Sequence, residues 1–276
     1  MITLSEIRIH PVKSCAGLSL PRARLDRYGL LHDRRFLLVD AAGHFLSQRQ
    51  LPAMARIRTR LEGATLRLRA PGQGDLTLPL EGRPGPRRSA ELWGQEVGGI
   101  DQGDPCAHWL SRFLGLPCRL LHMPRDFDRR VSTRYFAGLA HTAYSDGYPL
   151  LLISEESLAE LNQRLSHPVA MERFRPNLVV RGGPPFGEDT WRRLRIGDQE
   201  LVFTKPCSRC AVTTVDPESG QRGPEPLRTL ARFRRFPDGV LFGVNLVHLG
   251  RGLLETGAPV EILDAAEAPF SERGEP

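Results

Sequence analysis

Apolar positions in the first 80 residues come in short runs, several of them alternating with polar ones, and turns rich in glycine and proline separate the runs. Short or alternating runs of this kind are typical of β-strands. The pattern predicts strands at residues 2–9, 35–40, 44–47, 61–70 and 76–80. Regularly spaced short strands favour a barrel or a sandwich.

Helical periodicity is confined to three segments. Residues 104–114 begin with Asp-Pro, a capping residue followed by proline at the first helical position. Residues 154–165 begin with a serine and two glutamates and carry leucines at helical spacing, and a third helix is expected at residues 226–234. Strands resume at residues 177–180, 194–196, 200–204, 240–248 and 260–262. The predicted fold class is therefore mainly β (α+β) with a few helices.

Between these segments, residues 125–149 show no clear period. A loop of that length in a compact domain is often functional. The composition is otherwise ordinary, because 40% of the 276 residues are hydrophobic and 25% are charged, as in globular proteins. No apolar run approaches the length that spans a bilayer, and the N-terminus lacks the basic segment and apolar core of a signal peptide. We expect a cytoplasmic protein without membrane contact, whose cysteines stay reduced.

The chain is basic, with a formal charge of +6 and a pI of about 9.4. The hypothesis of a nucleic-acid-binding barrel would depend on this charge alone. The basic residues are spread along the chain and interleaved with apolar ones, which favours a solvated protein surface instead. Lys13 and Lys205 are the only lysines, and each lies beside a cysteine. Lysine suits a compact point-charge contact to phosphate, although two residues are few enough for chance.

Two of the five cysteines, Cys207 and Cys210, lie close together in the stretch 205–217, flanked by Lys205 and Arg209. Nearby cations favour the thiolate, the form that acts as nucleophile or metal ligand. The chain has no second pair for a four-cysteine zinc site. A thioredoxin-like pair would open a helix, whereas the β-branched run 211–215 reads as a strand. From spacing alone, two core thiols are as plausible as a functional pair.

The whole stretch, through Asp216-Pro217 and Gly220, resembles the cofactor loop of the MOSC family. Members of that family hold a pterin-bound molybdenum through one cysteine, and the resemblance implies that Cys210 is this ligand. Further blocks fit the same family in the same order over nearly the whole chain. They are residues 7–15, 33–36, 144–149, 174–178 and 242–245.

The resemblance implies an N-terminal β-barrel-like domain at residues 1–122 and a MOSC β-barrel domain at residues 123–276. It points to the branch of bacterial and mitochondrial amidoxime-reducing proteins, which use a molybdenum-molybdopterin cofactor to reduce small N-hydroxylated compounds to amines. The chain has neither the ferredoxin-like domain of some bacterial relatives nor the targeting segment of the mitochondrial ones. Electrons are therefore expected from a separate partner, a flavin reductase or an iron–sulfur protein.

The family's cofactor contacts carry over onto one set of positions. Lys13, Arg34 and Arg175 can neutralise the cofactor phosphate, and Asp146 and Asn177 can bind the polar edge of the pterin. A thiolate suits a metal that already carries dithiolene sulfurs. Taken singly, each residue also has an ordinary structural explanation, so the assignment depends on their joint occurrence. The full set is Lys13, Ser14, Arg34, Ser145, Asp146, Gly147, Arg175, Asn177, Cys207, Ser208, Cys210 and Asn245.

Two points stay open. Asp216 and His141 are weak candidates for a proton donor, and a structural role is the better interpretation of each. A protein that carries, inserts or sulfurates the cofactor without turnover is the alternative function. The chain shows no sign of a pyridoxal-phosphate lysine for sulfur transfer, and its complete N-terminal domain favours the reductase.

Overall fold

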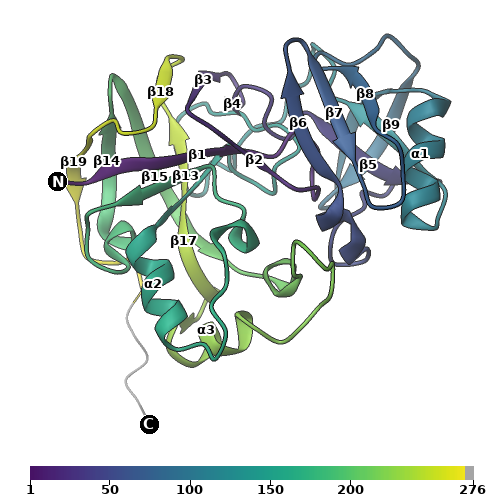
Figure 1. Ribbon diagram of the computed structural model, residues 1–276. Helices are drawn as coiled ribbons and strands as arrows, with labels where there is room; N and C mark the ends of the chain where they lie inside the picture. Colours follow the sequence, from purple (N-terminus) through teal and green to yellow (C-terminus); the bar gives the residue numbers. More distant parts are fainter. Residues whose placement is uncertain (271–276) are drawn as a thin grey trace.

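The computed structural model describes residues 1–270, and the fold is mainly β with three α-helices (Figure 1). A nine-stranded sheet dominates one side of the molecule. Its strands follow the order β19-β14-β15-β17-β12-β13-β1-β2, with β16 attached to β17. Their bounds are β1 Thr3–Ile9, β2 Leu18–Leu20, β12 Leu150–Ser154, β13 Leu178–Arg181, β14 Trp191–Ile196, β15 Gln199–Ser208, β16 Arg235–Phe236, β17 Gly239–His248 and β19 Val260–Ala265.

Smaller sheets make up the rest. A four-stranded sheet runs β5-β11-β10-β9, and two three-stranded sheets run β18-β3-β4 and β6-β7-β8. Their bounds are β3 Arg22–Asp26, β4 Gly29–Leu30, β5 Phe36–Asp40, β6 Arg58–Glu62, β7 Thr65–Arg69, β8 Leu76–Pro79, β9 Arg87–Leu92, β10 Gln95–Asp101, β11 Cys118–His122 and β18 Leu253–Glu255. The helices are α1 Asp104–Leu114, α2 Glu155–Gln163 and α3 Leu227–Phe233.

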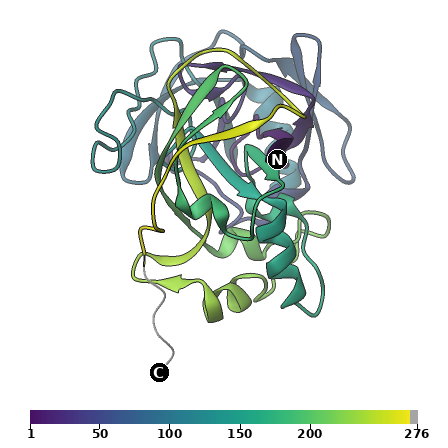
Figure 2. The same cartoon turned by 90° about the vertical axis from the view of Figure 1, so that its left-hand side faces the viewer.

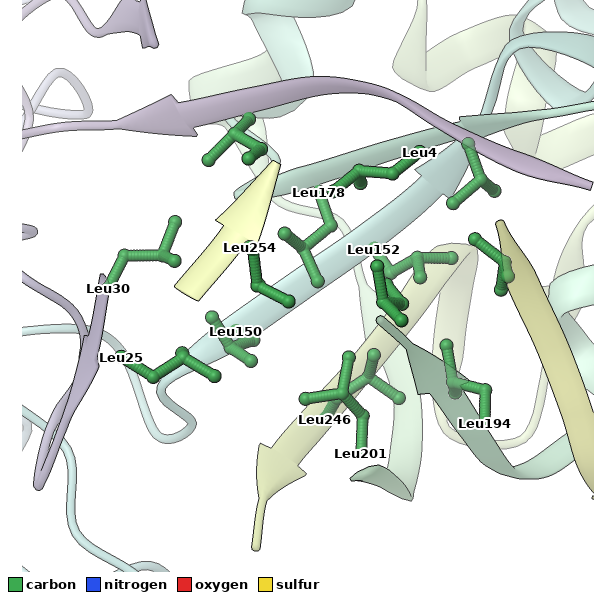
Figure 3. Close-up of a cluster of buried hydrophobic side chains, with 14 of the residues drawn as sticks. Leu4, Leu25, Leu30, Leu150, Leu152, Leu178, Leu194, Leu201, Leu246 and Leu254 are labelled. Atoms are coloured by element: carbon green, nitrogen blue, oxygen red, sulfur yellow. The ribbon is translucent and has the colours of Figure 1, made fainter. Parts of the chain in front are cut away.

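The large sheet has a leucine-rich core that both ends of the chain share. Leu4 of β1, Leu152 of β12 and Leu246 of β17 lie together in it, as Figure 3 shows. Strand β1 pairs antiparallel with β13, and β18 pairs with β3. The beginning of the chain is thus built into the C-terminal half. The division into domains at residues 122 and 123 stays a prediction, and residues 271–276 of its second part lie outside the described residues.

Two of the three remaining cores in residues 1–270 involve helices. One lies between β5–β8, β11 and α1 in the blue half of Figure 1. The other joins α2 and α3 to the strand ends of the large sheet, and Figure 2 shows these two helices together in the lower part of the view. Ser154 caps α2, since its hydroxyl accepts from the Ser157 amide at 3.0 Å. None of the helices in residues 1–270 is long and apolar enough to cross a membrane.

Three local predictions were wrong. Residues 211–215 do not form a strand: Ala211–Thr214 is a 3-10 helix, η4. The hydroxyls of Thr213 and Thr214 donate to carbonyls three residues earlier, at 3.0 and 2.8 Å, and this local bonding prevails over their β propensity. Residues 44–47 make only isolated bridges, and α1 begins at Asp104 itself, with Gly103 as its N-cap.

Candidate functional site

All twelve residues predicted from the family resemblance line one pocket. They come from loops and strand ends that are far apart in the sequence. The β1–β2 and β4–β5 connections supply the contributions of the first 34 residues, and the long loop before β12 supplies residues 145–147. The segment before β13, the end of β15 with the loop that follows it, and β17 supply the rest. The fold therefore brings both halves of the chain to the same place.

Left-handed backbone marks three positions around this pocket. Ser14, Arg34 and Arg175 have φ values of 66°, 49° and 57°, a conformation that disfavours side chains larger than glycine. The buried Gln48 amide donates to the Ser14 carbonyl at 2.7 Å, and the Arg34 amide donates to the His10 carbonyl at 2.9 Å. Strained positions of this kind persist only where the surroundings hold them, and they concentrate at binding sites.

One end of the pocket is a partly buried hydrogen-bond network around Arg34. The Arg34 guanidinium donates to the Asn177 side-chain oxygen at 3.0 Å and to the Arg175 carbonyl at 3.2 Å. It also forms an ion pair with Asp33. Burial by itself raises the pKa of Asp33, but Arg34 and His10 outweigh it and hold that pKa well below its usual range. The Arg34 side chain is thus fixed in place by three residues: Asp33, Asn177 and, through its main chain only, Arg175.

Two more cations lie at this end. Lys13 is buried and forms an ion pair with Asp146, whose carboxylate reaches solvent. Burial lowers the pKa of Lys13 to about 8, although Asp146 opposes the shift. Arg175 donates to the Cys15 carbonyl at 2.6 Å. Burial, followed by repulsion from Arg34, lowers the pKa of Arg175 to about 10. An anion bound here would relieve the cost of burying these charges.

The other end of the pocket carries the two half-exposed thiols. Cys207 lies near the end of β15, and Cys210 is the N-cap of η4. Arg209 donates to the Cys207 sulfur at 2.9 Å, and Arg49 approaches the Cys210 sulfur at 3.9 Å. The remaining three cysteines are buried, and burial raises the pKa of each, that of Cys15 to about 12. The pocket thus receives the two thiols with the greatest exposure.

The charge around the pocket is strongly positive. Five cationic side chains and one carboxylate line it. Within residues 1–270, Arg49, Arg175 and Arg209 form no ion pair, and the Arg209 Nε atom is buried without a hydrogen-bond partner. Buried or half-buried guanidinium groups without carboxylates are suited to an anionic ligand.

Comparisons with known proteins agree with the sequence motif. Residues 1–117 match the family model of the MOSC N-terminal beta barrel domain, and residues 140–261 match that of the MOSC domain. The chain belongs to the MOSC family. It is 36% identical to mitochondrial amidoxime-reducing component 1 of Mus musculus, over 95% of this chain and 82% of that protein. The Homo sapiens component 1 is 37% identical, over 95% of this chain and 83% of the relative. Mitochondrial amidoxime reducing component 2 of Bos taurus is 36% identical, over 94% of this chain and 82% of that protein.

Neither residue weighed as a proton donor lines the pocket of this MOSC protein. His141 is buried and lies 2.9 Å from an Asp128 oxygen. Asp216 forms an ion pair with Arg173 at 2.9 Å and accepts from the Ser219 hydroxyl. Both therefore have structural partners, in line with the preferred interpretation. Lys205 also stays outside, because its ammonium lies over the Tyr135 ring, 5.0 Å from the centroid.

Several residues at the pocket were not predicted from the sequence. Arg209 stands between the two predicted cysteines and could have been included on that ground. Arg49 and Phe45 have no local signal, because they reach the pocket only through folding of the N-terminal half. Trp93 lies beside it, at the tip of the β9–β10 hairpin, and its indole donates to Asp146 at 3.2 Å. The sequence indicates only a possible turn at Trp93-Gly94, and the strands on either side of this turn were not predicted.

Proposed function

We propose that this MOSC protein is a molybdenum-cofactor-dependent reductase that converts amidoximes and other N-hydroxylated compounds to amines. The observation that carries the proposal is the pocket itself, in which five cationic side chains and two half-exposed thiols meet. The amidoxime-reducing names of relatives at 36–37% identity support the same reaction class. The family resemblance supports the cofactor.

The residues present fit such a cofactor. A molybdenum-molybdopterin group has an anionic phosphate, a polar pterin edge and a soft-ligand metal. Lys13, Arg34 and Arg175 would hold the phosphate, and Asn177 and Asp146 would bind the pterin edge. Cys210 would be the protein ligand of the metal. Within residues 1–270, no three His, Cys, Asp or Glu side chains gather as ligands, so a metal here needs its other ligands from the cofactor. When bound, this group supplies the two-electron chemistry that breaks the N–O bond.

The protein's own part is to bind and orient. Arg129 is buried and donates to the Ser145 carbonyl at 2.6 Å and the Asp146 carbonyl at 2.9 Å, which fixes the loop beside Lys13. The Asn177 side-chain amide accepts a hydrogen bond from the Arg34 guanidinium and donates one to the Arg8 carbonyl at 3.2 Å. One amide therefore aligns two segments of the site. Cys207, held by Arg209, would complete the wall next to the metal ligand without being one itself.

We further propose that electrons come from a separate protein, a flavin reductase or a small iron–sulfur protein. The chain has no Gly-x-Gly-x-x-Gly following a strand, and its cysteines lack iron–sulfur spacing. The test uses protein made in a host that synthesises the cofactor. This protein should contain about one molybdenum per chain, because one cysteine ligand per chain is proposed. It should also reduce a simple amidoxime when a reduced viologen supplies the electrons.

The donor experiments separate the parts of the proposal. With NADH or NADPH alone the protein should be inactive, and a flavin reductase or iron–sulfur protein should restore turnover. Steady NADH-dependent reduction by the pure chain would refute the partner requirement. Full molybdenum loading without activity from any donor would favour a cofactor carrier instead.

A further inference from the structure

Arg49 is a cation that lies beside the proposed metal ligand. Its guanidinium carbon lies 4.2 Å from the Trp93 ring centroid and 5.8 Å from that of Phe45, and one of its nitrogens lies 3.9 Å from the Cys210 sulfur. It forms no ion pair within residues 1–270. Stacking of this kind holds a guanidinium in a fixed plane and leaves its edge free to donate. Arg49 thus presents a fixed positive charge beside the thiol.

Several contacts hold this side chain where it is. Trp93 has a left-handed φ of 57° and is followed by Gly94 at 73°, so the hairpin turn projects the indole toward the pocket. Its N–H donates to Asp146, and its ring packs on Phe45 at 4.9 Å. From the other half of the chain, Arg222 donates to the Arg49 carbonyl. Such support is more than a solvated surface arginine needs.

The other cations of the pocket have different tasks. Lys13 is paired with Asp146, Arg34 is paired with Asp33, and Arg175 is bonded to the Cys15 carbonyl at the buried end. Arg209 contacts Cys207 and the Phe174 carbonyl. Arg49 therefore remains as the charge that a molecule entering beside Cys210 would meet.

We propose that Arg49, positioned by Trp93, determines substrate specificity by charge: it favours N-hydroxylated compounds with an anionic substituent and disfavours cationic ones. This inference rests on the proposed reductase function. A carboxylate on the substrate can accept two parallel hydrogen bonds from the free edge of the guanidinium. A cationic substituent has no partner there and meets like charge. The product, an amidine from an amidoxime or an amine from another N-hydroxylated base, is protonated at neutral pH, so the same charge also favours its release.

The first experiment needs no cofactor. Iodoacetate and iodoacetamide both alkylate the thiolate and are similar in size, so the ratio of their rates cancels the thiolate fraction and reports the potential at the sulfur. At Cys210, the iodoacetate-to-iodoacetamide ratio should fall roughly fivefold in Arg49→Leu, the effect of one nearby charge in a hydrated site. Trypsin cuts after Arg209 and separates the two thiols, so Cys207 is the internal reference. An unchanged ratio at Cys210 contradicts the proposal.

Matched variants isolate the role of each residue. Arg49→Lys keeps the charge and should retain most of the ratio. Trp93→Leu should lower it and Trp93→Phe should not, because phenylalanine still offers a stacking face. The control Arg112→Leu removes an exposed charge from α1, on the N-terminal half, and should leave the ratio unchanged. Equal ratios in Trp93→Leu and wild type would contradict the positioning role.

The second experiment uses the loaded enzyme and three benzamidoximes, with a carboxylate, a hydrogen or a trimethylammonium group on the ring. In wild type, kcat/KM should fall in that order. Arg49→Leu should reduce the anionic-to-cationic preference about tenfold, mainly through KM, with the neutral compound little affected. Loss of molybdenum in Arg49→Leu would make Arg49 a cofactor contact and overturn the proposal. If the loaded wild type reduces none of the three, the reductase function fails, and the alkylation ratio alone decides the charge assignment.

Discussion

Both ends of the pocket contain arginines, but the arginines at the two ends have different partners. At the buried end, Arg34 and Arg175 have left-handed backbone and are bonded on several sides. At the thiol end, Arg49 and Arg209 lie on aromatic faces or beside sulfur, and they have no carboxylate partner within residues 1–270. All four arginines are half-buried, so the two ends differ in what holds the guanidinium: hydrogen-bonding protein groups at the buried end, and aromatic rings or sulfur at the thiol end. The first end suits a ligand that stays, and the second suits one that exchanges.

The substitution with the largest expected effect lies at the thiol end. Cys210→Ala should abolish amidoxime reduction, because it removes the one proposed protein ligand of the metal. Cys207→Ala is the matched control three residues away in the same motif, and it should retain molybdenum. Metal analysis and viologen-linked activity of both variants give the answer. Normal activity in Cys210→Ala would remove the ligand assignment.

At the buried end, the expected effect is on cofactor retention. Arg34→Ala and Arg175→Ala each leave the anion less compensated, which should weaken its binding by roughly 1.5–3 kcal/mol per charged hydrogen bond. Molybdenum content after dialysis measures this loss, with the exposed Arg112→Ala on α1 as the control. Equal occupancy in wild type and in the double variant of Arg34 and Arg175 would contradict the assignment of the phosphate site.

The two ends also differ in how far the sequence predicted them. At the buried end, Lys13, Arg34 and Arg175 stand in local blocks that resemble the family, and the structure brings them to one pocket. Their bonds could not be predicted, since left-handed backbone at Arg34 and Arg175 is a consequence of packing. At the thiol end, Arg49 was missed, because it comes from a loop in the other half with no motif of its own.

The fold shows the same limit. Apolar alternation found β1, β5 and β17, whose buried faces are long or continuous. It missed β9 and β10, because β9 is exposed at four of its six positions and carries little apolar pattern. It also predicted a strand at residues 211–215, where threonine hydroxyls bonded to nearby carbonyls hold a 3-10 helix instead. Local hydrogen bonding and tertiary contacts thus decide where the hydrophobic pattern is weak.

The pH dependence of the free energy of unfolding tests whether the Lys13 ammonium is buried and poorly solvated. Its pKa of about 8 lies below the ordinary value of 10.5, so between these pH values the unfolded chain holds a proton that the folded one has lost. The free energy of unfolding of cofactor-free protein should therefore rise with pH across this window, by about 3 kcal/mol. Below pH 8 both states are protonated, and the cost of burying the charge is fully present.

Urea unfolding from pH 7 to pH 10.5 measures this rise. Lys13→Met should lack it, and Lys205→Met, which changes the other lysine of the chain, should keep it. The cofactor phosphate should hold the Lys13 proton and remove the rise from loaded protein. A rise that is the same in Lys13→Met and wild type would show that other groups cause it.

The smallest effect should come from Cys15, the buried thiol next to Ser14. Its side chain is inaccessible and its pKa is raised to about 12 by burial, so it is a neutral packing group. The contact that matters to the pocket is its carbonyl, which accepts from Arg175 and is kept in any substitution. Cys15→Ala should therefore lower the free energy of unfolding by about 1 kcal/mol and leave molybdenum content unchanged. Denaturant titration and metal analysis together check this. Loss of molybdenum with little loss of stability would mean that the buried end depends on a thiol as well, and the contrast between the two ends would no longer hold.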